Sequence, residues 1–194
     1  MTTKELIEKF NTLLTSQLEH TDVQIPTACC LSTTGLDGYP NARFLALKGT
    51  DDDSFHITGP FDTKKSQEID SSNKIALTFW WPEIGTQIRI QGQTELLSDK
   101  LVEKYFYERP VDSQLTALVF SQGQELVDEQ QLESELANAK ERYQNKKVPR
   151  PDNWGGYRVI PIRIEFLQFA ESRIHQRELF TFEDGTWINT KLQP

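Results

Sequence analysis

Three residues near the C-terminus, Arg173, His175 and Arg177, have types and spacing that could serve chemistry. On a β-strand, positions i, i+2 and i+4 aim all three side chains at one side of the sheet. Two arginines and an imidazole on one side repel each other unless an anion or an acidic side chain lies between them. From the residues alone, this is the strongest indication that the chain binds an anionic ligand.

A second group, Tyr105, Arg109 and Ser113, lies in a helical pattern that is interrupted by Pro110. A phenol, a guanidinium and a hydroxyl at this spacing can bind a phosphate ester, because all three groups donate hydrogen bonds to its oxygens. The simpler interpretation is a buried tyrosine with a satisfied hydroxyl and a surface arginine.

Four further cations lie in the first third of the chain: Arg43 and Lys48 bracket an apolar run, and Lys64 and Lys65 stand at the predicted start of a helix. Cations beside a helix N-terminus suit a phosphate, because free backbone N–H groups converge there. Arg43 and Lys48 are an odd number of residues apart, so a regular strand would place them on opposite faces and in different sites, unless a bulge intervenes. Spacing alone favours solvated charges at strand ends.

The run TQIRIQG alternates polar and apolar residues, which is typical of a strand with one buried face. Gln87, Arg89 and Gln91 would share the polar face. Amides on such a face could hydrogen-bond the edge of a heterocycle, although any half-exposed strand shows the same pattern.

The periodicity along the chain predicts elements that can position these residues. They are an amphipathic helix over 3–19, β-rich runs over about 27–97 and 157–192, a short helix over about 64–71 and helices over about 98–145. Thr2 and Glu5 have the spacing of a capping box for the first helix. We therefore expect a single α+β domain, mainly β, over residues 1–194, with an antiparallel meander or barrel and packed helices.

Composition excludes several classes of protein. The chain has 194 residues, 37% hydrophobic and 26% charged, with a net charge of −8, which predicts a globular protein and argues against general binding to nucleic acid or anionic membranes. There is no apolar run of membrane-spanning length and no signal-peptide pattern, so we expect a cytoplasmic protein. The adjacent Cys29 and Cys30 favour reduced thiols, and the three scattered histidines predict no metal site.

Several blocks, taken in order, carry a family resemblance. They are ARFLALKG, SFHITGPFDTKK, FWWPEIGTQIRIQG, YFYERPVDSQ, SQGQ, VPRPDNWGGYRV, IEFLQF, SRIHQR and TWINTKLQP. Together they resemble the pyridoxamine 5′-phosphate oxidase family over nearly the whole chain after the first helix. The resemblance implies an FMN-binding split β-barrel with packed helices, and a homodimer that holds FMN at the subunit interface.

The resemblance also implies a role for each matching residue. The implied FMN contacts are Arg43, Lys48, Lys64, Lys65, Gln87, Gln122, Gly123, Leu167 and Arg177. The residues implied to bind the phosphate of a vitamin B6 substrate are Lys48, Tyr105, Arg109 and Ser113. Arg173 and His175 are implied to face the pyridine ring of the substrate and to act as the catalytic pair.

For this family the implied reaction is oxidation of pyridoxamine or pyridoxine 5′-phosphate at C4′ to pyridoxal 5′-phosphate. Hydride passes to the flavin, and molecular oxygen then reoxidises it and leaves as hydrogen peroxide. The flavin carries the redox chemistry, so the protein has mainly to position two phosphorylated ligands face to face.

The chain also departs from the family pattern. Leu167 stands where the family usually has tryptophan, and Gly123 stands where it usually has serine, so we expect weaker contact with FMN. The longer basic N-terminal segment of typical members has no counterpart before the first helix. Two alternatives therefore stay open: a related FMN-dependent oxidoreductase acting on another flat anionic heterocycle, and a non-catalytic protein that binds flavin or a B6 phosphate. Turnover of different substrates would separate the two enzymes, and binding without flavin reduction would identify the third case.

Overall fold

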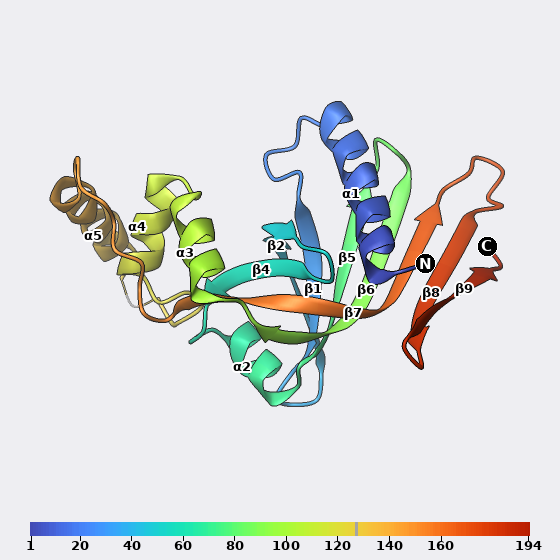
Figure 1. The fold of residues 1–194 in the computed structure, drawn as a ribbon. Coiled ribbons are helices and arrows are strands. Elements are labelled where there is room, and N and C mark those ends of the chain that lie inside the picture. The colour runs from blue at the N-terminus through green and yellow to red at the C-terminus, as the bar shows by residue number, and fades with distance from the viewer. Residues whose placement is uncertain (127) are drawn as a thin grey trace. The chain divides into compact units, whose positions relative to one another are not determined.

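A computed structural model describes residues 1–126 and 128–194 of the chain (Figure 1). The helices in these residues are α1 (Thr3–His20), α2 (Lys64–Ser71), α3 (Asp99–Tyr107), α4 (Val111–Val119) and α5 (Glu129–Arg142). The strands are β1 (Ala28–Thr34), β2 (Pro40–Ala46), β3 (Gly49–Thr50), β4 (Phe55–Pro60), β5 (Lys74–Trp81), β6 (Thr86–Leu96), β7 (Trp154–Gln168), β8 (Gln176–Glu183) and β9 (Thr186–Leu192). None of the described helices is long and apolar enough to cross a membrane.

The strands form one sheet in the order β2-β1-β5-β6-β7-β4-β3, and β8 pairs with both β7 and β9. The chain divides into two compact units. The first comprises residues 1–57, 68–95 and 158–194, and the second comprises residues 58–67 and 96–157. The α+β, mainly β class expected from the sequence is confirmed by these elements.

Helix α1 begins with the predicted capping box. The Thr2 hydroxyl accepts a hydrogen bond from the Glu5 backbone N–H at 3.2 Å, and the Glu5 carboxylate accepts one from the Thr2 N–H at 2.7 Å. These bonds satisfy backbone donors that have no partner within the helix. The helix lies across the sheet (Figure 1). Its apolar side chains pack there, and the Phe10 ring lies 5.0 Å from Phe55 and 4.9 Å from Phe79.

The buried face of the sheet in the first unit carries one of the predicted phosphate ligands. Leu31 on β1 pairs with Arg43 on β2 and with Leu77 on β5, and Leu77 pairs with Ile90 on β6. Directly paired residues of antiparallel strands point to the same face. Arg43 therefore shares the face of the buried Leu31, Leu77 and Ile90.

The opposite face of the same strands carries exposed aromatic side chains. Cys30 on β1 pairs with Phe44 on β2, which is 79% exposed, and Trp80 on β5, which is 53% exposed, pairs with Gln87 on β6. Gln87 therefore points to the face opposite that of Arg43. Large apolar side chains on an open sheet face are typical of a surface that another molecule covers.

The second unit has its own core, built around Phe106 on α3 and Trp154 at the start of β7. Their rings meet edge to face at 5.0 Å. Pro110 separates α3 from α4 because it has no N–H with which to continue a helix. The backbone carbonyl of Pro110 accepts a bond from the Ser113 N–H at 2.9 Å in the first turn of α4, which begins at Val111.

Candidate functional site

Arg43 is held on the buried sheet face by a carboxylate from α2, which begins at Lys64. The Arg43 guanidinium donates to Glu68 at 2.8 Å and to the Thr33 hydroxyl at 2.5 Å. Glu68 is fully buried and also accepts from Thr33 at 2.6 Å and from the Asn41 amide at 2.8 Å. Burial by itself raises the pKa of Glu68, but these hydrogen bonds outweigh it and hold the pKa below its ordinary value. These contacts orient the guanidinium on the buried face of the sheet.

Lys65 and Gln122, both implied to contact FMN, lie together in the second unit. The Lys65 ammonium donates to the Thr63 hydroxyl at 2.9 Å and to the Gln122 side-chain oxygen at 3.5 Å. A Cβ at Gly59 would lie 3.1 Å from the Lys65 Cε and Nζ, so the glycine leaves room for the ammonium group. Gly123 has a φ of +84°, a conformation that favours glycine over the serine of the family pattern. This local geometry fits a lysine that binds a phosphate.

Leu167 and Arg177 are cross-strand partners on β7 and β8. The Arg177 guanidinium donates twice to Glu165, at 2.8 Å from Nε and 2.6 Å from Nη2. Arg89 on β6 donates to the other oxygen of the same carboxylate at 3.1 Å. Glu165 is buried, and its carboxylate is the acidic partner expected from the sequence to offset the charge of Arg177.

The structure corrects the predicted arrangement of Arg173, His175 and Arg177. Strand β8 begins only at Gln176, so the first two residues do not share its face with Arg177. Arg173 has a φ of +61°, and its N–H donates to the Ala170 carbonyl at 3.0 Å in a turn. The prediction that one strand carries all three residues was therefore wrong, because the chain must reverse direction between the antiparallel strands β7 and β8.

The same turn holds His175. Its Nδ1 accepts a hydrogen bond from the Ala170 backbone N–H at 3.1 Å. An accepting Nδ1 places the ring proton on Nε2. In the part of the chain that the structure describes, Nε2 makes no hydrogen bond, so this N–H can face a ligand.

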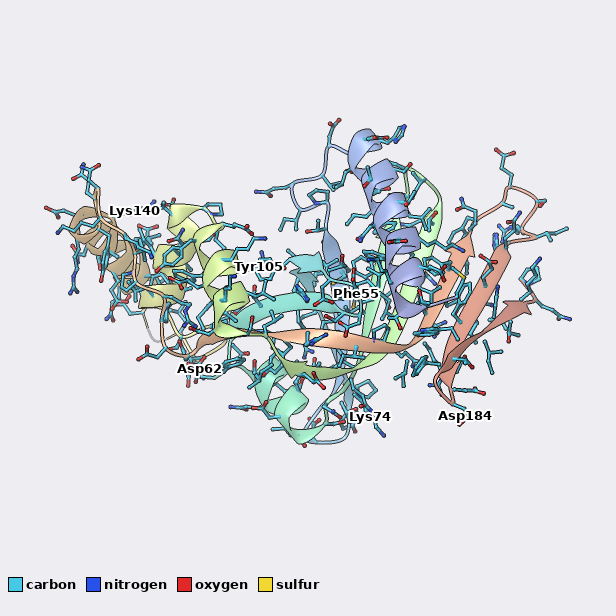
Figure 2. The ribbon with its side chains drawn as sticks, in the orientation of Figure 1. Phe55, Asp62, Lys74, Tyr105, Lys140 and Asp184 are labelled. Atoms are coloured by element: carbon cyan, nitrogen blue, oxygen red, sulfur yellow. The ribbon has the colours of Figure 1, made fainter. Side chains whose placement is uncertain are left out.

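Of the residues predicted to bind the substrate, Arg109 has the surroundings that most clearly suit an anionic ligand. Its guanidinium lies 5.3 Å from the Trp154 ring and 5.9 Å from the Phe106 ring. Burial lowers the pKa of Arg109, and among the described residues its buried Nη1 has no hydrogen-bond partner. Tyr105 projects from α3 and is buried (Figure 2), and Ser113 lies in the first turn of α4. A buried donor without a partner is rare, and an anionic ligand would satisfy it.

Each implied site residue falls into one of the two units. The first unit holds Arg43, Lys48, Gln87, Leu167, Arg173, His175 and Arg177, and the second holds Lys64, Lys65, Tyr105, Arg109, Ser113, Gln122 and Gly123. Lys48 lies between β2 and β3, and its backbone N–H donates to the His56 carbonyl at 2.9 Å. The ligand roles of all these residues remain predictions.

Two acidic residues that position the implied ligands, Glu68 and Glu165, are missing from the set drawn from the sequence. A signal for Glu165 exists, since a carboxylate interrupts the apolar run of β7. Glu68 lies on a short polar helix, where nothing in the spacing marks it as buried.

Replacing Glu165 with glutamine is expected to lower the free energy of unfolding by about 1–2 kcal/mol, because charge-assisted hydrogen bonds from Arg89 and Arg177 are lost while both cations stay partly hydrated. Denaturant unfolding of the protein without FMN measures this. Glu178→Gln is the matched control, because Glu178 pairs with Lys9 at a partly exposed site and should change stability by less than about 1 kcal/mol. Equal losses of unfolding free energy in the two variants would show that Glu165 stabilises the fold no more than a partly exposed ion pair does.

Comparison with known proteins places the chain in a family. The model of the pyridoxamine 5′-phosphate oxidase family matches residues 19–143, and the model of the pyridoxine 5′-phosphate oxidase C-terminal dimerisation region matches residues 154–194. The pyridoxine/pyridoxamine 5′-phosphate oxidase of Trichormus variabilis is 38% identical over 170 residues, which cover 87% of this chain and 79% of that protein. The enzyme of the same name from Synechocystis is 40% identical over 169 residues, with the same coverage of both chains.

Solved structures agree with this assignment. PhzG from Burkholderia lata, in complex with tetrahydrophenazine-1-carboxylic acid, matches with a TM-score of 0.89 and 26% identity, covering 99% of this chain and 93% of that one. A pyridoxamine 5′-phosphate oxidase-related, FMN-binding protein from Nostoc punctiforme matches with a TM-score of 0.77 and 15% identity, covering 94% of this chain and 96% of that one, and it supports the fold. The predicted split-barrel fold is confirmed, and the chain belongs to the pyridoxamine 5′-phosphate oxidase family of FMN-dependent oxidoreductases.

Proposed function

We propose that this protein oxidises pyridoxamine and pyridoxine 5′-phosphates to pyridoxal 5′-phosphate, with oxygen as the acceptor and hydrogen peroxide as a product. The observation that carries the proposal is the buried Nη1 of Arg109, which lacks a partner among the described residues. A phosphate monoester would complete its hydrogen bonding, and Tyr105 and Ser113 lie on either side of Arg109 along the chain. The names of the relatives supply the vitamin B6 part of the substrate.

Each of the chain's own residues has a task in this proposal. The substrate phosphate is bound by Lys48, Tyr105, Arg109 and Ser113. The bound phosphate holds the substrate ring in one position in the site. Arg173 and His175 align the pyridine ring, and His175 presents its Nε2–H because Nδ1 is engaged by Ala170. FMN, when bound, supplies the two-electron acceptor, so no residue needs to act as a nucleophile.

The proposed FMN ligands also support a site shared by two copies of the chain. Arg43 lies on the buried face of the first unit's sheet, whereas Gln87, Leu167 and Arg177 belong to the opposite face, where Glu165 and Arg89 also meet. One FMN molecule can reach both sets if the second set comes from another copy. The exposed Phe44 on the outer face and the match to a C-terminal dimerisation region favour such a homodimer.

The family matches also bear on domain organisation. The two family models together match residues 19–143 and 154–194, which include parts of both compact units, and we propose that residues 1–194 function as one FMN-binding domain.

Mixing two inactive variants tests the shared site. Arg43→Gln and Arg177→Ala are each expected to lose most FMN binding as homodimers. A mixed dimer should regain one intact FMN site, since both substitutions then fall in the same site, and FMN titration should give about half the wild-type stoichiometry. If the mixed dimer binds no more FMN than its parents, both arginines contact FMN from a single copy and the shared site is wrong.

A second candidate function is oxidation of another flat anionic heterocycle. It is favoured by the similarity to PhzG, whose structure contains tetrahydrophenazine-1-carboxylic acid. Leu167, which is smaller than the tryptophan of the family pattern, would leave more space for a larger ring system.

Steady-state turnover distinguishes the two functions. The FMN-loaded protein is supplied with pyridoxamine 5′-phosphate, pyridoxine 5′-phosphate or a reduced phenazine carboxylic acid, and hydrogen peroxide release is measured. The proposed function predicts the highest kcat/KM for the B6 phosphates. Turnover of the phenazine compound alone would overturn it in favour of the second candidate.

A further inference from the structure

Three rings on the first unit form a continuous series that ends at His175, and two of them, Trp80 and Phe169, lie outside the residues implied by the family resemblance. The Trp80 ring lies 4.9 Å from Phe169 in an edge-to-face arrangement, and the Phe169 ring lies 4.8 Å from the His175 ring. We propose that Phe169 is a positioning residue for the oxidation, acting through His175. The proposal rests on the proposed function, because it takes His175 to face the substrate.

Phe169 is fixed at its backbone. Its N–H donates to the Gly85 carbonyl at 2.8 Å, which ties the end of β7 to the turn between β5 and β6. The preceding Gln168 donates from its amide nitrogen to the Ile84 carbonyl at 2.8 Å and accepts from the Thr86 hydroxyl at 2.8 Å. These three bonds hold the segment that carries the Phe169 ring, so the ring is a defined surface for His175.

His175 is constrained from two directions. The Ala170 N–H holds Nδ1 at 3.1 Å, and the Phe169 ring limits the tilt of the imidazole, with 56° between the two ring planes. A single hydrogen bond leaves a ring free to rotate about that bond, whereas a second contact on the ring fixes its plane. Phe169 therefore sets the direction in which the Nε2–H points.

The exposed fractions of the two aromatic side chains argue against a role in core packing. Phe169 is 40% exposed and Trp80 is 53% exposed, so neither ring fills the hydrophobic core of the unit. Trp80 also pairs with Gln87, an implied flavin contact, and Phe169 contacts His175, an implied substrate contact. The Trp80 and Phe169 rings thus connect Gln87 with His175, two residues that the proposed reaction requires close together.

The first measurement observes His175 directly and does not depend on activity. Imidazole ¹³C–¹H NMR spectra resolve the signals of His20, His56 and His175, and the His175→Ala variant assigns the third. Phe169→Leu should shift the His175 signals, because the ring current and the fixed ring plane are lost, while the other two histidines keep their positions. Phe182→Leu is the matched control, since Phe182 is 43% exposed and lies 5.2 Å from the Trp187 ring.

The second measurement is kinetic. Phe169→Leu should lower kcat about two- to tenfold, as expected from the loss of one aromatic contact. KM should change less, because the phosphate ligands are untouched, and Phe169→Tyr should restore kcat. In a His175→Ala background, Phe169→Leu should have no further effect, since a residue acting through His175 loses its role with it.

The two measurements separate the possible failures. Unchanged His175 signals in Phe169→Leu, or additive losses of kcat in the double variant, overturn the positioning role. If the His175 signals shift but no B6 phosphate is oxidised by the wild-type protein, the proposed function fails, and with it the catalytic meaning of the contact, although the contact itself is verified.

Discussion

Replacing Arg109 with alanine should raise the KM for pyridoxine 5′-phosphate by roughly 10- to 150-fold, which corresponds to the 1.5–3 kcal/mol typical of a hydrogen bond to a charged group. The guanidinium nitrogen Nη1 is buried and has no partner among the described residues, so the phosphate is its proposed partner. Steady-state kinetics with the FMN-loaded variant measures the change. FMN affinity should stay at the wild-type value, because Arg109 belongs to the proposed substrate group.

Stability should change little in this variant. Among the described residues, the buried Nη1 of Arg109 has no hydrogen bond to lose, and the bond from the Gln114 amide goes to the Arg109 backbone carbonyl, which alanine keeps. The matched control is Arg142→Ala, in which an arginine over the ring of Tyr143 is removed from α5. A KM that rises equally in both variants would show that Arg109 acts only through general charge.

Replacing Glu68 with alanine should lower the free energy of unfolding by about 3 kcal/mol, the lower end of the range for breaking a buried ion pair. The reason is that Glu68 is fully buried and accepts hydrogen bonds from Thr33, Asn41 and Arg43, and alanine removes this shared acceptor. Arg43 also loses its orientation, so FMN affinity should fall as well. Denaturant unfolding and FMN titration measure the two effects.

The loss in Glu68→Ala should depend on pH. Because the pKa of Glu68 is lower in the folded state than in the unfolded chain, the carboxylate stabilises the fold above its ordinary pKa, and this contribution disappears as the pH falls toward the folded-state pKa. The difference in stability between wild type and variant should therefore shrink as the pH falls below the ordinary glutamate pKa of about 4.5. Glu178→Ala, at a partly exposed pair, serves as control with a change under about 1 kcal/mol. A difference between wild type and Glu68→Ala that stays constant as the pH falls through this region would contradict the account.

Local interactions explain which elements were predictable from the sequence. The capping box of α1 depends on two residues three positions apart, and the interruption at Pro110 depends on the proline ring itself. Both features need no tertiary contact, so the pattern indicates them directly. The mainly β class followed in the same way from short strand-forming runs between turn residues.

The positioning of the site was less predictable, because it depends on contacts between distant residues. Arg43 and Glu68 are 25 positions apart, and Arg89 and Glu165 are 76 apart, so no spacing rule brings these charges together. The turn at Arg173 likewise depends on the pairing of residues outside the local sequence. Its positive φ follows from the reversal between two paired strands, a requirement that a local strand pattern does not contain.

The most direct test of the central claim is a mixing experiment without oxygen. The purified protein is loaded with FMN and combined anaerobically with pyridoxamine 5′-phosphate while the visible flavin band is followed. The account predicts that the band bleaches, that one pyridoxal 5′-phosphate forms for each flavin reduced, and that air restores the band. A flavin that stays oxidised in the presence of saturating substrate would contradict the proposed oxidation of vitamin B6 phosphates.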